Sequence, residues 1–375
     1  MTLIASFEYQ HTPILVGDLL ITSKGAPTRE AATPLIHEPN KIVGKEGTRS
    51  IVSLRQKLAI LHEHICLAWT GDLFYAERFA EHIRSFSLGK ASIGYDDLRA
   101  VILAYPREDL ENHLDFIVYS WHGTGWGYFS NLKPFDLDLQ ILSQMRVGGS
   151  GTAHFIRHFE TAAKALPLTG SLDEYTLLGT RALLYASLAS AQQFFEGVGL
   201  TEWWGGGFEV VVFRDGRLAK LGPICWLYWE CAEIASEHFS LRLKSEFMYQ
   251  YYIDDTAMFW IDEGSQGKIH SISPPFRTTD QPLQRPKIFD TDIVVNLVRV
   301  EMLDGDNYCG GSVDTSAGIN SRDLTITWLD SEDKTTLGIR EAFIERMLRS
   351  MPLPVGSSVD VNFWGNALQF RQRQD

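Results

Sequence analysis

The chain has 375 residues, of which 45% are hydrophobic and 12% aromatic, enough to build a large core in one or two domains. Its formal net charge of -13 and the lack of a basic cluster argue against a nucleic-acid partner. No apolar run is as long as a membrane span, and the N-terminus lacks the regions of a signal peptide, so we expect a cytoplasmic protein with no membrane partner.

The cysteine and histidine pattern does not indicate a metal site or a disulfide framework. The four cysteines lack paired metal spacing and are too few to staple a fold of this size. His62 and His64 could share one face of a strand, but no third ligand accompanies them. Because the sequence also lacks a phosphate-binding loop and a dinucleotide fingerprint, we expect neither a metal nor a cofactor.

The first half of the chain begins with strands. Apolar runs and turn signals predict strands at residues 3–9, 13–21, 51–54, 58–61 and 65–69. A stretch at 22–47 is rich in Pro, Gly, Lys and Glu, which favours a long loop.

Helices and strands then alternate in blocks. Residues 73–83 have helical spacing with Asp72 as a possible N-cap, and a second helix at 95–105 ends before Pro106. The pattern continues with a hairpin at 116–129, helices at 153–166 and 175–195, and a strand at 208–213. This order predicts an α+β fold, a four-layer sandwich in which two antiparallel sheets are covered by helices on both outer faces.

The chain beyond the sandwich divides into smaller parts. We expect a sandwich domain at 2–226, a β-rich extension at 227–270, a Pro-rich linker at 271–287 and a small α+β domain at 288–375. In this last domain strands are predicted at 293–302, 324–328 and 359–370, with one amphipathic helix at 339–351.

Four short motifs in the first 226 residues carry a resemblance to a known family. They are, in chain order, Thr2 with Asp18, Lys57 fourteen residues before Gly71, Gly149-Ser150-Gly151, and Glu202 three residues before the Gly205-Gly206-Gly207 turn. In this order and spacing, residues 2 to about 226 resemble the proteasome β-type subunits, which are N-terminal-nucleophile (Ntn) hydrolases. The residues after the family's Asp differ, since Leu19 and Leu20 replace polar side chains.

The resemblance implies a proteasome-like αββα sandwich and a catalytic role for Thr2, Asp18, Lys57, Ser150 and Glu202. Removal of Met1, which is usual before a small residue, would leave Thr2 with both a hydroxyl nucleophile and an α-amine that can take its proton. Lys57 would lower the pKa of that amine, and Asp18 would neutralise the buried lysine. Ser150 and Glu202 would surround the α-amine. The backbone N–H of Gly71 is the expected oxyanion donor, with Gly151 as a second backbone position.

We therefore expect an N-terminal threonine hydrolase that cleaves amide bonds, with peptides as substrates. Two alternatives stay open, a hydrolase of small amides and a non-catalytic proteasome-like subunit that serves as a scaffold or partner-binding module. Ten tryptophans and the aromatic segment 226–229 favour a homo-oligomer, of which a ring is one form, unless these aromatics hold the extension to the core. The extension could also bind a regulatory partner.

Overall fold

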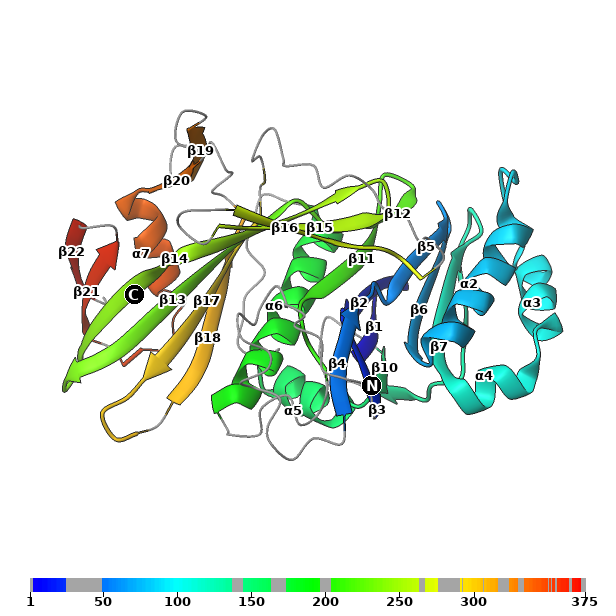
Figure 1. Cartoon of the computed structure of the whole chain (residues 1–375), viewed down its shortest axis with the longest axis horizontal. Helices are drawn as coiled ribbons and strands as arrows, with labels where there is room; N and C mark the ends of the chain where they lie inside the picture. The colour runs from blue at the N-terminus through cyan, green and yellow to red at the C-terminus, as the bar shows by residue number, and fades with distance from the viewer. Residues whose placement is uncertain are drawn as a thin grey trace.

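The chain folds into a mixed α+β structure that consists mainly of strands, most of them paired in antiparallel sheets (Figure 1). The described part of the chain has six helices and no closed barrel. The computed structural model describes residues 3–24, 49–136, 144–162, 173–195, 204–262, 267–275, 291, 293–305, 307–315, 324–329, 334–349, 351, 353–354, 356–363 and 366–371. The predicted loop at 22–47 and the predicted linker at 271–287 lie mostly outside these residues.

The first sheet has six strands in the order β12-β11-β2-β1-β10-β9. They are β1 (Leu3–Tyr9), β2 (Thr12–Asp18), β9 (Pro134–Asp136), β10 (Gln144–Gly149), β11 (Phe208–Arg214) and β12 (Arg217–Lys220). Side chains alternate along β1, so that Leu3, Ala5 and Phe7 belong to one core cluster. Ile4 belongs to another, on the opposite face. Both faces of this sheet are therefore buried, as the nearly continuous apolar runs of β1 and β2 require.

A second sheet of four strands lies against the face of the first sheet that carries Ile4 (Figure 1). Its order is β5-β6-β7-β8, with β5 (Leu58–His62), β6 (Ile65–Gly71), β7 (Leu114–Trp121) and β8 (Trp126–Ser130). Between the two sheets, Ile4 and Leu15 of the first pack with Leu58, Ala68 and Ile117 of the second. The two sheets thus share a small apolar interior.

Three helices cover the outer face of the second sheet, α2 (Leu73–Ser87), α3 (Tyr95–Ala104) and α4 (Arg107–His113). The predicted N-cap is confirmed, because the Asp72 carboxylate accepts a hydrogen bond from the Phe74 backbone N–H at 2.9 Å. Helix α4 is not predicted by the apolar pattern. Pro106, read from the sequence as a stop signal, is also the N-cap residue of α4, where the N–H that a proline lacks would have no partner within the helix.

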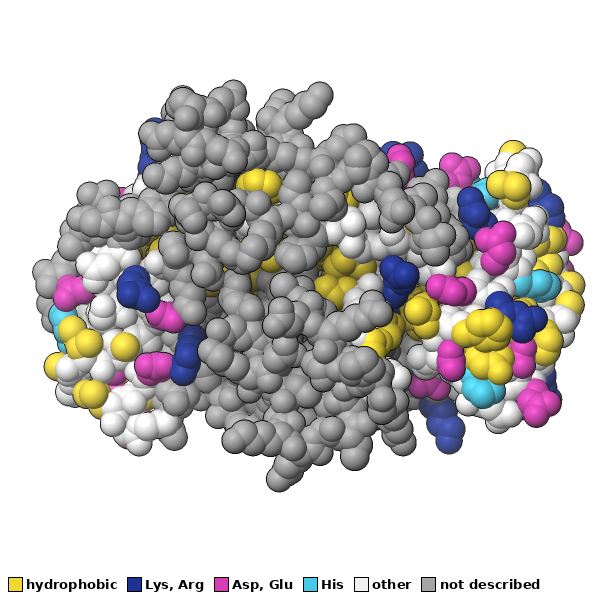
Figure 2. All heavy atoms as spheres, in the orientation of Figure 1, with side chains coloured by type: hydrophobic (Ala, Val, Ile, Leu, Met, Phe, Trp, Pro, Cys, Tyr) yellow, Lys and Arg dark blue, Asp and Glu magenta, His cyan; other side chains and the backbone are white. Residues whose placement is uncertain are grey.

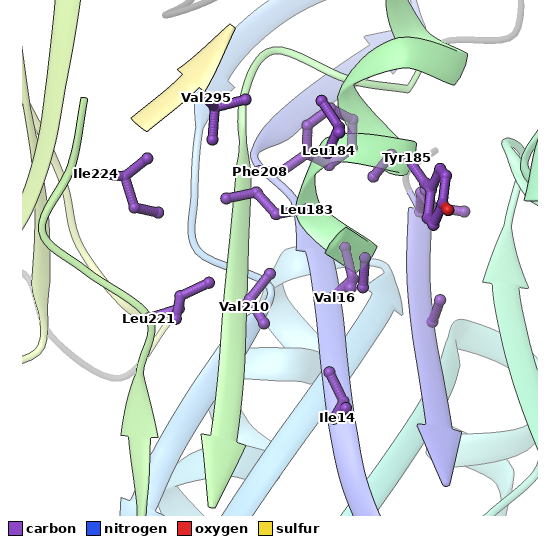
Figure 3. Packing of buried hydrophobic residues seen from close by; sticks show 14 of the residues in the cluster. Ile14, Val16, Leu183, Leu184, Tyr185, Phe208, Val210, Leu221, Ile224 and Val295 are labelled. Carbon is purple, nitrogen blue, oxygen red and sulfur yellow. The ribbon is translucent and has the colours of Figure 1, made fainter. Parts of the chain in front are cut away.

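Helices α5 (Thr152–Ala162) and α6 (Glu174–Phe195) cover the other face of the first sheet. Figure 3 shows Leu183 and Leu184 of α6 packed near Val16 of β2 and Phe208 of β11. Helix α6 is apolar around most of its circumference, a pattern typical of a helix buried on several sides.

The structure supplies the second partner of α6, an eight-stranded sheet from the C-terminal half of the chain. Ile224 and Val295 of this sheet join the same core cluster as α6 (Figure 3). The sheet contains β13 (Ile224–Ala235), β14 (His238–Ile253), β15 (Thr256–Asp262), β16 (Gly267–Ile272), β17 (Ile293–Glu301), β18 (Asn307–Asp314), β21 (Ser358–Phe363) and β22 (Asn366–Arg371). Two of its pairings, β13 with β17 and β14 with β21, are parallel.

The aromatic segment at 226–229 is buried in this sheet. Trp226 faces the α6 cluster, whereas Trp229 faces a second cluster that includes helix α7 (Glu341–Arg349). Both indole side chains are almost fully buried, so this segment holds the C-terminal half of the chain to the sandwich. Two short ladders complete the described strands, β3 (Leu20–Lys24) with β4 (Arg49–Leu54) and β19 (Leu324–Leu329) with β20 (Lys334–Ile339). Among the described helices, none is long and apolar enough to cross a membrane.

Candidate functional site

Asp18 and Lys57 are both completely buried, at the edge where β2 and β5 meet. Asp18 is the last residue of β2, and its Oδ2 accepts a hydrogen bond from the Gly205 backbone N–H at 2.8 Å. Lys57 immediately precedes β5 and lies so near β2 that a Cβ added at Gly17 would be 3.0 Å from the Lys57 Cβ. The two side chains interact electrostatically.

In the described part of the chain, one polar atom of each side chain has no hydrogen-bond partner, although the Asp18 carboxylate is bonded to the Gly205 backbone through its other oxygen. Among the described residues, the atoms without such a partner are Lys57 Nζ and Asp18 Oδ1. The ammonium lies over the indole ring of Trp69, 4.3 Å from the ring centroid. A buried charge without a hydrogen bond is costly, and such groups gather where a protein needs their chemistry.

Burial shifts the pKa of each group in the direction that favours its uncharged form. It lowers the pKa of Lys57 from 10.5 to about 7, against the attraction of Asp18 and Glu209. Burial also raises the pKa of Asp18 from 3.8 to about 7, against the attraction of Lys57 and the Gly205 hydrogen bond. A lysine that exchanges its proton near pH 7 suits general acid–base chemistry.

Glu209, which the sequence analysis does not single out, fixes the backbone at Lys57. Its Oε1 accepts hydrogen bonds from the backbone N–H groups of Lys57 and Leu58, at 2.6 and 2.7 Å. Its Oε2 forms an ion pair with Lys220, whose ammonium also donates to the Leu58 carbonyl. The one sequence feature that points to Glu209 is its place as an acidic residue inside the apolar run of β11, because a carboxylate in a buried strand needs partners.

An open cleft of about 750 Å³ lies at the ends of β6, β7 and β10. Gly71 and Ser150 line it, together with Thr70 and His113, and β3 supplies one wall. The Ser150 Oγ is shielded from solvent and has no hydrogen-bond partner in the described part of the chain. The structure therefore brings Gly71 and Ser150 to one cleft, while Asp18 and Lys57 are not among its lining residues.

Asp115 is a further carboxylate of this cleft that the sequence analysis does not identify. It is half-buried near the start of β7, and burial raises its pKa, opposed by a hydrogen bond from the Gly149 backbone. Nothing in the local pattern separates it from a solvated strand-end aspartate, so only the packing of β7 beside β10 could reveal it.

The predicted glycines occupy positions that tolerate no side chain. Gly71 has a φ of +115°, and a Cβ there would be 2.1 Å from the His113 carbonyl oxygen. A Cβ at Gly151 would be 2.6 Å from the Trp204 indole ring. Gly71 therefore allows a close backbone approach at the cleft, and Gly151 allows one beside Trp204.

Thr2 and Glu202 lie outside the described residues. The strand that follows Thr2 is placed, however, because Leu3 pairs with Gly149 and Ile4 pairs with Gly17. The β1 strand thus begins between the residue before Ser150 and the residue before Asp18. In the described ranges, no group of three or more His, Cys, Asp or Glu side chains could hold a metal ion.

Comparison with protein-family models and with curated proteins finds no match to this chain.

Proposed function

We propose that the chain is an N-terminal-nucleophile hydrolase in which Thr2, after removal of Met1, attacks amide bonds of peptides. The layers support this assignment, since helices α2–α4, two facing antiparallel sheets and helices α5–α6 follow one another as in a proteasome-like αββα sandwich. The C-terminal half would be an addition to that fold.

The observation that carries the proposal is the buried Lys57–Asp18 pair beside the strand that starts at Leu3, because Lys57 Nζ and Asp18 Oδ1 have no hydrogen-bond partner among the described residues. Thr2 is joined to Leu3 by one peptide bond, so its Cα is about 3.8 Å from the Cα of Leu3. The β1 registers run towards Ser150 on one side and Asp18 on the other. We infer that a nucleophile at position 2, one residue before this strand, acts close to Lys57 Nζ and Asp18 Oδ1.

In the proposed reaction, the Thr2 Oγ attacks the substrate carbonyl carbon while the α-amine takes the hydroxyl proton. The tetrahedral intermediate then collapses, the C–N bond breaks, and the amine product leaves with that proton. Water hydrolyses the resulting ester and regenerates Thr2. Lys57, with a pKa near 7, would assist these proton transfers, and backbone N–H groups at Gly71 would stabilise the oxyanion.

Substrate would enter the cleft lined by Gly71 and Ser150. Its volume of about 750 Å³ is within the range of sites that enclose a small ligand or a few residues of a peptide. Because the cleft is open and not an enclosed cavity, it can take a segment of an extended peptide, which favours a peptide over a small amide.

The test begins with the intact mass of the protein purified from its own cell, which should correspond to a chain that starts at Thr2. Wild-type protein should hydrolyse fluorogenic peptides and be labelled once by a threonine-directed electrophile. Thr2→Ala should lose both activities, whereas the matched Thr2→Ser variant, which keeps a hydroxyl, should retain labelling.

Two results would refute the enzyme proposal. One is full retention of Met1 in the native protein, because an acylated amine could not act as the base. The other is unchanged turnover in Thr2→Ala. Either result would favour a non-catalytic, partner-binding subunit.

A further inference from the structure

We propose that Gln56 is a positioning residue through which the C-terminal sheet maintains the environment of Lys57. The inference rests on the proposed function only in treating Lys57 as a catalytic group. Its physical content, the dependence of Lys57 on Gln56, can be measured without any hydrolysis.

Gln56 fastens the segment before β5 to the C-terminal half of the chain. Its side-chain Nε2 donates hydrogen bonds to the carbonyl oxygens of Asp255, in the β14–β15 turn, and Ile272, at the end of β16, both at 2.6 Å. Its backbone N–H donates to the Ser273 carbonyl at 3.3 Å. Gln56 is completely buried; its bond to Ile272 is buried, and its bond to Asp255 is partly buried. The three bonds join the two halves of the chain one residue before Lys57.

The same residue also holds the ring that lies against Lys57. The carbonyl oxygen of Gln56 accepts a hydrogen bond from the Trp69 Nε1–H at 3.1 Å. The backbone N–H of Trp69 donates to the Lys57 carbonyl at 3.0 Å, and the Trp69 indole lies 4.3 Å from the Lys57 ammonium. Trp69 is therefore fixed by both Gln56 and Lys57, and its position follows that of residues 56–57.

Loss of the Gln56 amide would admit water to this junction. The carbonyls of Asp255 and Ile272 would lose their donor, and buried carbonyls without a partner recruit water. Burial is the largest cause of the lowered Lys57 pKa, so hydration must raise it. The charged groups that face Lys57 are Asp18 from β2, Glu209 from β11 and Arg55 on its own segment. A change at position 56 leaves all three charges in place.

The experiment compares full-length Gln56→Met and Trp69→Phe with wild type. Methionine has the length of glutamine but no donor, and phenylalanine keeps an aromatic face while removing the bond to Gln56. The matched control is Asn296→Leu, because Asn296 is an equally buried amide that bonds an indole, that of Trp229, at 3.0 Å within the C-terminal sheet. The Lys57 titration is followed by NMR of lysine labelled with 13C at Cε, with the resonance assigned by its loss in Lys57→Met.

Gln56→Met should raise the Lys57 titration midpoint by about one pH unit or more, since full burial shifts a lysine by up to about 3–5. Trp69→Phe should raise it less, and Asn296→Leu should leave it at the wild-type value. The acidic limb of the pH–rate profile for hydrolysis should move to higher pH by the same amount in Gln56→Met.

An unchanged Lys57 midpoint in folded Gln56→Met would overturn the inference, as would an equal change in Asn296→Leu. These outcomes are separate from those of the proposed function. A protein without hydrolytic activity whose Lys57 midpoint still rises in Gln56→Met would refute the proposed function and support the positioning role. An active protein with an unmoved midpoint would do the reverse.

Discussion

Replacing Lys57 by methionine should stabilise the fold while removing activity. Lys57 is completely buried, and its ammonium has no hydrogen-bond partner in the described residues. A lysine pKa lowered from 10.5 to about 7 corresponds to about 5 kcal/mol of unfavourable burial of the charged form. Loss of the attraction to Asp18 offsets part of this gain, so Lys57→Met should increase the unfolding free energy at pH 7 by about 1–4 kcal/mol.

Lys220→Met is the matched control, because Lys220 is also buried but paired. Its ammonium binds the Glu209 carboxylate and the Leu58 carbonyl. The same substitution there leaves a buried carboxylate without its cation and should destabilise the protein by about 3–5 kcal/mol. Urea unfolding followed by tryptophan fluorescence measures the unfolding free energy of each variant. If Lys57→Met lowered stability by as much as Lys220→Met, Lys57 would have a strong partner and the reasoning would fail.

The pH dependence of this stabilisation has a definite sign. The folded-state pKa of Lys57 is lowered, so between about pH 7 and 10.5 the unfolded chain binds more protons than the folded one. The penalty of wild-type Lys57 is therefore complete below about pH 7 and disappears as pH rises towards 10.5. The advantage of Lys57→Met over wild type should shrink across the same window, and an advantage that grew with pH would contradict the assignment.

Three other predictions concern the cleft and assembly. Gly71→Ala should lose more than about 2 kcal/mol of stability in urea unfolding, because its Cβ would meet the His113 carbonyl. The control Gly216→Ala, which has a φ of +77° but open space around it, should lose only about 1 kcal/mol. Equal losses in the two variants would rule out the clash. Gly151→Ala should lose about 1–3 kcal/mol against the Trp204 ring, whereas Gly125→Ala, in open space, should be neutral; Trp204→Ala should relieve the effect if that contact is its cause. We expect light scattering to show a homo-oligomer, because apolar side chains such as Phe74 of α2 and Leu103 of α3 are exposed. Figure 2 shows hydrophobic side chains on the surface of this end of the molecule. A mass of 42.3 kDa at every concentration would contradict the expectation.

Much of the local structure follows from the sequence because it depends on nearby residues. Asp72 caps α2 and the hairpin of β7 and β8 forms where Gly123 and Gly125 predict a turn, since a cap and a turn need only a few neighbouring positions. Chain order also predicts helices outside paired sheets. Of the candidate residues, Asp18, Lys57, Gly71, Ser150 and Gly151 could be named from motif spacing before their surroundings were known.

The tertiary structure alone decides what surrounds those residues. Glu209 is one acidic residue in an apolar strand, and only the pairing of β11 with β2 brings it to the backbone of Lys57. Gln56 has no local feature that indicates a role, because its partners at 255, 272 and 273 are about 200 residues away in sequence. The pKa of Lys57 likewise depends on burial by distant elements. Charge, capping and periodicity are local properties, whereas desolvation and hydrogen-bond partnership depend on the packing of the whole chain.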